Sequence, residues 1–583
     1  MQPGGGMGPM GGGPQQPAGD EKKEGVAEAA PKTPGLLPTT PALPAPKGRR
    51  KRWKLFEMNG YFRLRTDWFK NFNQGFYDDP ALGGAPFARA LGCNSNKLGA
   101  PCDSSIGGSN VRLRLEPTLN LDEGTSVHMQ ADVLDNLVLG STPTNTPLNG
   151  VYNDGTRPPL GAFGNTQDPP TQGVNSDRTS IVVKRAWAEV AVPLGIVSFG
   201  RMPNHWGMGM LFNGGGKDPI NGTYDYDGDY GDTVDRASFS APIPGTNLRA
   251  MLAADWTFNG LASNQTSANK GNEGHPYDLD DSDDAQGWVG VISKMDSPQE
   301  FKDTVDRGDV AFNYGVYFEY RTQSWDTDLT DFNLGGTPDA VNRYTPRGLT
   351  MYNPDIWAKL GVGRVVLEME LAGQFGNVDA VDDLGLSQSL KIRKFGGVGR
   401  ATWKGLEGKL RLGIETGFAS GDQWDNTPQG TTNIAYANQL GGGTDSKLSA
   451  FMFNREYKVD MILWRRLYGA VTNAAYVKPF LAYDITKSIT FKVANISSFA
   501  LNSVATPGNG TMYGTEFDAD IGYSAGGLFA GISYGVLFPF GAMAHPVDDL
   551  DSGGTFGYGD ATTSNTGDAE TSHAIQMRFV LGF

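Results

Sequence analysis

The 583-residue sequence has no stretch of about 18 consecutive apolar residues, so the chain cannot cross a membrane as helices. It also lacks an excess of positive charge. Its formal net charge of -15 argues against a nucleic-acid binder, because phosphate recognition needs a net basic face. Catalytic motifs are equally scarce: the five histidines are scattered, and no nucleophile elbow, HExxH motif or phosphate loop occurs. The sequence therefore predicts no enzyme activity and no cofactor.

Cysteine is nearly absent, with two residues in the whole chain. Cys93 and Cys102 lie in one loop-like segment, which predicts a local disulfide if the protein resides in an oxidising compartment. A zinc site would need further cysteine or histidine ligands close by, and the sequence has none there.

What the sequence does have is apolar and polar residues in strict alternation. In the last eleven residues, 573–583, the odd positions from Ile575 onwards are apolar, whereas Gln576 and Arg578 are polar. Successive strand side chains point to opposite faces, so this segment predicts a strand with one face to lipid and one to water. The same pattern recurs in the segments 56–68, 111–121, 310–321, 365–375, 409–418, 489–493 and 513–523. Each fits a tilted membrane strand of roughly 9 to 11 residues.

The links between these segments alternate in length, as in bacterial barrels with short periplasmic turns and long outer loops. The eight short links fall near 121–124, 193–195, 242–245, 297–308, 361–363, 404–408, 486–487 and 525–527. The nine long links are 69–110, 140–180, 206–232, 259–285, 323–348, 376–389, 420–473, 501–511 and 539–571. The expected fold is an all-β transmembrane antiparallel barrel of about 18 strands (range about 16 to 20), with both termini on the periplasmic side.

This rhythm predicts one outer-membrane barrel domain over residues 53–583. Residues 1–52 are rich in Gly, Pro and Ala and end in a basic run, which predicts a disordered periplasmic tail. Whether the tail docks a periplasmic partner is left open. No secretory signal precedes the barrel, so we expect a chain that has been processed, trimmed or started at a late start codon.

A barrel of this width leaves an aqueous path, so function should lie in charged residues that face the lumen. The predicted basic wall consists of Arg63, Arg65, Arg112, Arg114, Arg185, Arg201 and Arg578. The predicted acidic wall consists of Glu319, Glu368, Glu370, Glu415, Glu516, Asp518 and Asp520. Two such walls would create a transverse field that orients anionic solutes. The alternative is that these charges pair across neighbouring strands and only keep the lumen soluble.

Two kinds of loop segment stand out. The alternating residues 451–463 would break the rhythm of links if they formed a barrel strand, so we place them within the 420–473 loop. That loop is long enough to fold inward, with Trp464, Arg465 and Arg466 narrowing the channel. The acidic runs 225–232 and 278–284 could hold Ca²⁺, but we favour solvated loops because the first run lacks the EF-hand pattern.

Several short motifs resemble the alginate-export porin family. They are the Gly-Thr-Glu-x-Asp strand at 512–518, the hairpin partner at 531–539, the Ser-Gly-Asp strand end at 419–422, and the 186–189 strand leading to Phe199-Gly200-Arg201. The resemblance implies an 18-stranded barrel that passes an acidic polysaccharide through an arginine-rich constriction, and Glu516 and Asp518 match its motif. The whole chain, including residues 453–460, resembles more closely an uncharacterised family of large outer-membrane barrels from deltaproteobacteria, which supplies a fold and no substrate.

Three functions remain open. The first is an outer-membrane channel for small hydrophilic or anionic solutes, including export of an acidic polysaccharide. The second is a closed structural or adhesive barrel whose lumen is blocked by the 420–473 loop. The third is a soluble all-β protein. The first two imply a lipid bilayer as partner, and none involves nucleic acid.

Overall fold

The computed structural model describes residues 54–76, 105–138, 181–228, 231–257, 285–327, 344–379, 389–422, 447–545 and 566–583. All of them belong to the second of two compact units, Pro34–Phe583. Within these ranges, no helix is long and apolar enough to cross a membrane. The predicted tail, residues 1–52, lies outside them, so its disorder stays a prediction and its docking to a periplasmic partner stays open.

Eighteen long strands dominate the described residues. They are β1 (Phe56–Lys70), β2 (Ser105–Asn120), β3 (Thr125–Val138), β4 (Ile181–Val192), β5 (Gly195–Pro203), β6 (Thr233–Pro242), β7 (Arg249–Thr257), β8 (Ala285–Lys294), β9 (Ala311–Thr327), β10 (Tyr344–Val362), β11 (Val365–Val378), β12 (Leu390–Gly405), β13 (Leu410–Ala419), β15 (Ala474–Asp484), β16 (Ile489–Ala500), β17 (Met512–Ala525), β18 (Leu528–Pro539) and β19 (Ser572–Gly582). The shorter elements are β14 (Lys447–Leu448), the helix α3 (Pro298–Asp306), the 3-10 turns η2 (Leu406–Gly408), η4 (Ser503–Ala505) and η5 (Gly541–Met543), and the π-helical turn η3 (Leu463–Leu467).

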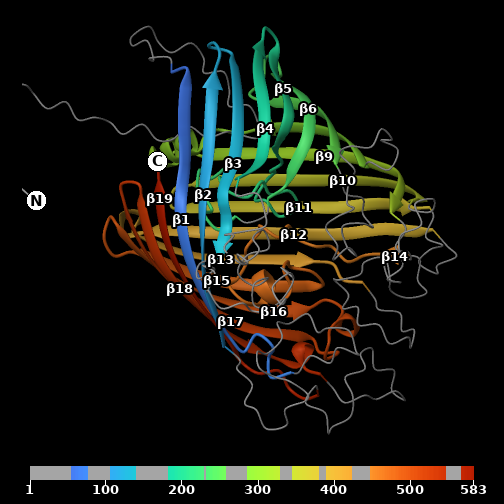
Figure 1. Ribbon diagram of the computed structural model, residues 1–583, viewed down its shortest axis with the longest axis vertical. Helices are drawn as coiled ribbons and strands as arrows, with labels where there is room; N and C mark the ends of the chain where they lie inside the picture. The colour runs from blue at the N-terminus through green and yellow to red at the C-terminus, as the bar shows by residue number, and fades with distance from the viewer. Residues whose placement is uncertain are drawn as a thin grey trace, which may run out of the picture. The chain divides into compact units, whose positions relative to one another are not determined.

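These long strands close into a single antiparallel barrel. Each pairs with the next one along the chain, and β19 returns to pair with β1 from Gly582 opposite Tyr61 to His573 opposite Lys70. Figure 1 shows the blue β1 beside the red β19. The two-residue β14 pairs in parallel with β12 and is not part of the closed wall. Closure leaves no strand edge unpaired, which a sheet in hydrocarbon requires.

The predicted rhythm of links is confirmed. The eight short links join β2 to β3, β4 to β5, β6 to β7, β8 to β9, β10 to β11, β12 to β13, β15 to β16 and β17 to β18. The longest of them carries α3, whose N-terminus is capped by Ser297 and Glu300 and whose Phe301 and Val305 pack against the start of β9. The C-terminal strand ends at the same rim, because Gly582 donates a hydrogen bond to Gly527 in the β17–β18 turn.

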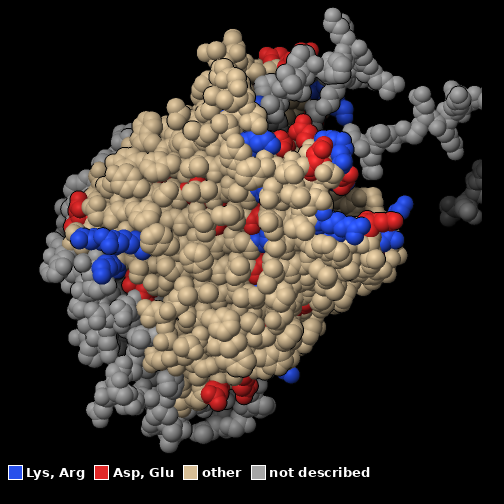
Figure 2. Space-filling view, turned by 180° about the vertical axis from the view of Figure 1, so that it is seen from behind, with Lys and Arg blue, Asp and Glu red and all other residues tan. Residues whose placement is uncertain are grey.

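The two-residue alternation sorts the side chains between the faces of the wall. In β19, Met577, Phe579 and Leu581 are exposed, whereas Gln576 is buried on the other face. Figure 2 shows that uncharged residues cover the broad middle of the visible outer face and that most charged atoms lie towards its margins. An apolar belt on a closed barrel is stable only in a bilayer, and barrels of this kind belong to outer membranes. The protein is therefore an outer-membrane barrel.

This placement predicts the effect of a charge on the outer face of β17. Phe517 is 50 % exposed and faces outward. Because the cation would have to enter hydrocarbon, Phe517→Arg should lower the free energy of unfolding by about 2 to 4 kcal/mol, measured by denaturant titration in lipid vesicles. Phe517→Leu is the control and should stay close to the wild type. An arginine variant as stable as the wild type would contradict a lipid-facing position.

The lumen contains chain from two long links. We call the described residues 204–228 and 231–232, between β5 and β6, the first inward loop, and residues 447–473, between β13 and β15, the second inward loop. One cluster of buried apolar residues joins lumen-facing strand residues such as Trp357 to Met210 of the first loop and Leu463 of the second. The bore is therefore narrowed by loops, because the strands of so wide a barrel cannot fill it with their own side chains.

Candidate functional site

The first inward loop is fixed to the wall by the carboxylate of Glu370 on β11. Its Oε1 atom accepts a hydrogen bond of 3.2 Å from the backbone N–H of Leu211, and its Oε2 atom accepts from the N–H groups of Met208 and Met210. Gly207 makes this convergence possible, since its φ is +57° and an added Cβ would lie 2.6 Å from Glu370 Oε2. One wall carboxylate thus holds three backbone donors of this loop.

The second inward loop is also fixed to the wall by a single carboxylate, which belongs to β17. Glu516 of β17 accepts hydrogen bonds from the N–H groups of Met461, Ile462 and Leu463 at 2.9, 2.7 and 3.0 Å. The side chain of Trp464 follows directly and donates from Nε1 to Ser498 Oγ of β16 at 3.0 Å. Both inward loops are therefore pinned by one buried glutamate each.

The two loops also contact each other in the lumen. The N–H of Asn454 donates to the carbonyl of Met210 at 2.7 Å, and its side chain donates to Asp232 Oδ2 at 2.7 Å. Lys458 donates to Asp225 Oδ2 at 2.5 Å and to the Asp227 carbonyl at 2.8 Å. Together the loops form one connected structure that runs from the β9–β11 wall to the β1–β2 wall.

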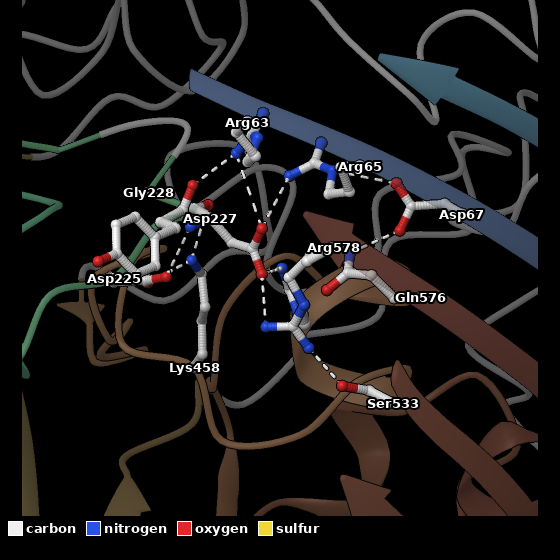
Figure 3. A network of polar contacts seen from close by, with 12 residues as sticks. Arg63, Arg65, Asp67, Asp225, Asp227, Gly228, Lys458, Ser533, Gln576 and Arg578 are labelled. Carbon is white, nitrogen blue, oxygen red and sulfur yellow. Dashed lines mark hydrogen bonds and ion pairs between the residues drawn. The ribbon is translucent and has the colours of Figure 1, made fainter. Parts of the chain in front are cut away.

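Beside β1, these connected loops present the carboxylate of Asp227, which is surrounded by guanidinium groups (Figure 3). Asp227 Oδ2 accepts a hydrogen bond of 2.9 Å from Arg578 Nη1 and lies 3.6 Å from Arg465 Nη2. Asp227 Oδ1 lies 3.7 Å from Nη1 of both Arg63 and Arg65. We call these four residues the arginine cluster. Asp227 itself is 3 % exposed, so its charge is balanced by the cluster rather than by bulk water.

Cations also hold the backbone around Asp227. Three consecutive carbonyls accept hydrogen bonds, Tyr226 from Arg63 at 2.7 Å, Asp227 from Lys458 at 2.8 Å and Gly228 from Arg112 at 2.8 Å. Charge-assisted hydrogen bonds of this kind are about twice as strong as neutral ones. The tip of the first inward loop is therefore held mainly by electrostatic contacts.

The same environment determines the protonation of Asp227. Burial alone would raise its pKa, but Arg578, Arg465 and the two arginines of β1 hold the pKa well below its ordinary value. Because the folded-state pKa is depressed, the stabilisation from the carboxylate is present above the ordinary pKa of an aspartate and is lost only as the pH falls through the depressed value. Asp227 is thus anionic at every pH near neutrality.

The structure places six of the seven residues of the predicted basic wall on the lumen side. Arg63, Arg65 and Arg578 belong to the arginine cluster, and Arg112 holds Gly228. Arg114 forms a two-bond pair with Asp132 of β3 at 2.7 and 2.8 Å, and Arg185 donates to the carbonyl of Gly214 at 2.7 Å. Most of this wall therefore binds the first inward loop or a neighbouring strand.

Arg201 is the exception, and its assignment to the lumen was wrong. It shares the outward face of β5 with Phe199, two residues earlier, which is 51 % exposed. There Arg201 pairs with Asp235 of β6 at 2.7 and 2.8 Å. Because strand side chains alternate with a period of two, Arg201 shares the face of Phe199, and this signal in the sequence places Arg201 on the outer face of the barrel.

All seven residues of the predicted acidic wall lie on lumen-facing positions of β9, β11, β13 and β17. Glu370 and Glu516 hold the loops. Four of the others accept hydrogen bonds from residues of the barrel wall: Glu319 from Asn353 at 2.6 Å, Glu368 from Trp357 at 3.3 Å, Glu415 from Arg400 at 2.7 Å, and Asp520 from Ser533. Asp518 lies on the same strand as Glu516, two residues away, and is 8 % exposed. Both sets of charges thus lie on lumen-facing strand positions, apart from Arg201, but residues of the two inward loops lie between them and many of the charges are paired.

The predicted inward position of Trp464, Arg465 and Arg466 agrees with the structure. Trp464 packs edge-on against Tyr513 of β17, with ring centroids 5.1 Å apart. Arg465 joins the arginine cluster, and Arg466 lies 3.8 Å from Asp67 of β1 and over the ring of Phe69. This short segment carries the second inward loop from one wall to the other.

In the described part of the acidic run, residues 225–228 and 231–232, Asp225 and Asp227 do not form the solvated outer loop that we expected. They face Lys458 and the arginine cluster, so these two carboxylates contact cations of the protein itself. The sequence does not show that this run lies beside an arginine-rich barrel wall, because that position depends on the path of the loop in the folded protein. Residues 278–284, Cys93 and Cys102 lie outside the described residues, so the second acidic loop and the disulfide stay predictions.

Comparisons with known proteins give the fold a context. No family model and no curated protein matches the sequence. Among solved structures, the chain is similar to Pseudomonas aeruginosa OpdK crystallised with vanillate (10 % identity, TM-score 0.41, 90 % of this chain and 98 % of that one). It is also similar to an anion-selective porin from Comamonas acidovorans (10 %, TM-score 0.35, 91 % and 99 %) and to the outer-membrane channel DcaP of Acinetobacter baumannii (10 %, TM-score 0.35, 91 % and 97 %). The second of these structures is described as a porin and the third as an outer-membrane channel, and the functional argument for this chain rests on its own residues.

Proposed function

We propose that the protein is a non-enzymatic outer-membrane channel for small hydrophilic solutes, with a preference for anions set at the arginine cluster. The observation that carries the proposal is the position of this cluster, inside a closed barrel and at the point where both inward loops meet. Arg465 and Arg578 keep 13 % and 21 % of their side chains exposed, so solutes in the lumen can reach their charge. Rings of arginine at a narrow point favour anions over cations.

The loops favour small solutes over a polymer. An acidic polysaccharide, which the resemblance to the alginate-export family implies, needs a continuous path wide enough for a chain. The inward loops instead connect the β9–β11 wall to the β1 wall through Asn454, Lys458 and Asp227, and the cluster arginines already bind a carboxylate. Polysaccharide export is therefore the secondary proposal, and it would require both loops to move.

The test is the reversal potential of single channels in planar bilayers under a potassium chloride gradient. The wild type should conduct in discrete steps and prefer chloride. Arg465→Gln should reduce the ratio of chloride to potassium permeability by about half, because it removes one exposed positive charge from the cluster. A barrel that stays silent at all voltages would count against the channel.

Arg201→Gln is the matched control. It removes the same charge from the outer face, away from the lumen, and should leave the permeability ratio unchanged. Equal effects of the two substitutions would show that the reversal potential reports the overall charge of the protein and not the cluster.

A closed structural or adhesive barrel is the alternative to any channel, and one observation favours it. The two loops contribute to a single buried apolar cluster with the wall, as a plug would. This candidate predicts a silent wild type whose conductance appears only when a loop is removed.

A further inference from the structure

The outward face of β12 carries positive charge at one end of the strand. In residues 390–395 buried and exposed side chains alternate, and the exposed ones are Lys391, Arg393 and Phe395. This end of β12 follows the 376–389 link, which is one of the long outer links, so it lies at the outer rim of the barrel. We call Lys391 and Arg393 the outer cation pair.

The sheet fixes the direction of both side chains. Arg393 lies opposite Phe375 of β11, and Lys391 lies opposite Lys447 of β14, so this end of β12 has a strand on either side. Between the two cations, Ile392 is buried in an apolar cluster on the inner face of the wall. Because strand side chains alternate, burial of Ile392 directs its two neighbours outward.

A row of aromatic side chains marks the outer edge of the apolar belt next to this pair. Tyr352 of β10 lies opposite Phe375 of β11, whose ring meets that of Phe395 edge-on with centroids 5.1 Å apart. Trp403 shares the outward face eight positions further along β12. In a tilted strand this separation spans roughly 20 Å of the membrane, close to the apolar band of about 25 Å that aromatic girdles flank. Phe395 therefore lies near the outer interface.

The outer cation pair lies just beyond this interface. Arg393 and Lys391 are two and four positions from Phe395, or roughly 7 and 13 Å along the strand, which places them among lipid head groups. Among the described residues, none forms an ion pair with either cation, and Asp379, which follows β11 at this rim, accepts a hydrogen bond from Asn377. Figure 2 shows Lys and Arg atoms grouped at the left margin of the uncharged belt.

We propose that the outer cation pair binds the phosphate groups of a phosphorylated glycolipid in the outer leaflet, with the acyl chains of that lipid against Phe395 and the apolar belt. Basic side chains at a membrane surface attract anionic head groups, and the planar guanidinium of arginine can donate two hydrogen bonds to one phosphate. A lipid fits this site better than a free anion, because the apolar belt begins directly beside the cations. The inference goes beyond the channel proposal, since it depends only on the position of the barrel in the membrane.

The experiment titrates the full-length protein, in a zwitterionic detergent, with bisphosphorylated lipid A and measures the dissociation constant by native mass spectrometry. The wild type should bind this lipid more tightly than the same lipid without phosphates. Lys391→Gln combined with Arg393→Gln should weaken binding about tenfold or more, because each cation near a head group contributes about fivefold. Lys391→Arg combined with Arg393→Lys keeps both charges and should retain most of the affinity.

The matched control removes two charges from the other end of the same hairpin. Lys404 and Lys409 are exposed beside the short link between β12 and β13, at the periplasmic rim. Lys404→Gln combined with Lys409→Gln changes the total charge by the same amount and should leave the dissociation constant within about twofold of the wild type. Heat-modifiable migration on gels verifies that each variant forms the barrel.

Three results would overturn the inference. Equal binding of lipid A with and without phosphates would show that the head group is not recognised. Equal losses in the two charge-removing variants would show that the lipid responds to overall charge and not to the outer cation pair. Displacement of lipid A by an excess of inorganic phosphate would assign the site to a free anion.

Discussion

Shortening the second inward loop should raise the single-channel conductance about threefold or more, because the loop crosses the lumen and carries part of the buried cluster within it. The structure offers a clean deletion. Met452 and Thr472 form an isolated antiparallel bridge, so removal of residues 454–470 brings together two chain ends that are already adjacent. A short glycine linker can join them. Conductance in planar bilayers is the measurement.

The barrel should survive this deletion, since β13 and β15 pair directly from Leu410 opposite Tyr483 to Ala419 opposite Ala474. Heat-modifiable migration verifies closure. Glu516→Gln serves as a second variant that loosens the loop without shortening it, and we expect it to increase current fluctuations. A silent wild type with a conducting deletion would establish the closed barrel. Identical conductance in both proteins would show that the loop does not limit the channel.

Releasing the first inward loop from the wall is the second change for which we expect a large effect, here on the rate at which the loop opens. Glu370→Gln replaces a carboxylate that accepts three backbone N–H groups by an amide whose NH₂ group opposes those donors. A buried donor left without an acceptor costs about 1 to 3 kcal/mol, so the docked loop should lose about 2 kcal/mol and open more than tenfold more often. The readout is the rate of trypsin cleavage at Lys217, which lies within this loop.

Glu319→Gln is the control for this variant. Glu319 is another buried lumen-facing glutamate, and it accepts its hydrogen bond from Asn353 of the neighbouring strand β10 rather than from the loop. Its cleavage rate should match the wild type. Equal rates in all three proteins would mean that Glu370 does not hold the loop in place.

The barrel could be predicted from the sequence because its determinants are local. A strand has a period of two, so the alternation around Phe579 and Arg578 fixes which side chains face lipid and which face the lumen. Short and long links give the strand count in the same way, since adjacent antiparallel strands need only a turn between them. Arg201 was misplaced where this period was not followed, although Phe199 marks its face.

The candidate site depends on contacts that no local pattern contains. Asp227 lies 351 positions from Arg578, and the neighbouring Tyr226 lies 163 positions from Arg63 of β1, which holds its carbonyl. Alternation places Arg63, Arg65 and Arg578 in the lumen, and the length of the 420–473 loop predicts that it folds inward. Which carboxylate the arginines bind is decided only when the barrel closes, because closure brings β19 to β1 and presents Glu370 and Glu516 to the loops. The sequence by itself thus determined the wall and its two faces, whereas the tertiary structure alone decided what crosses the lumen, since that depends on where two loops find acceptors for their buried backbone N–H groups.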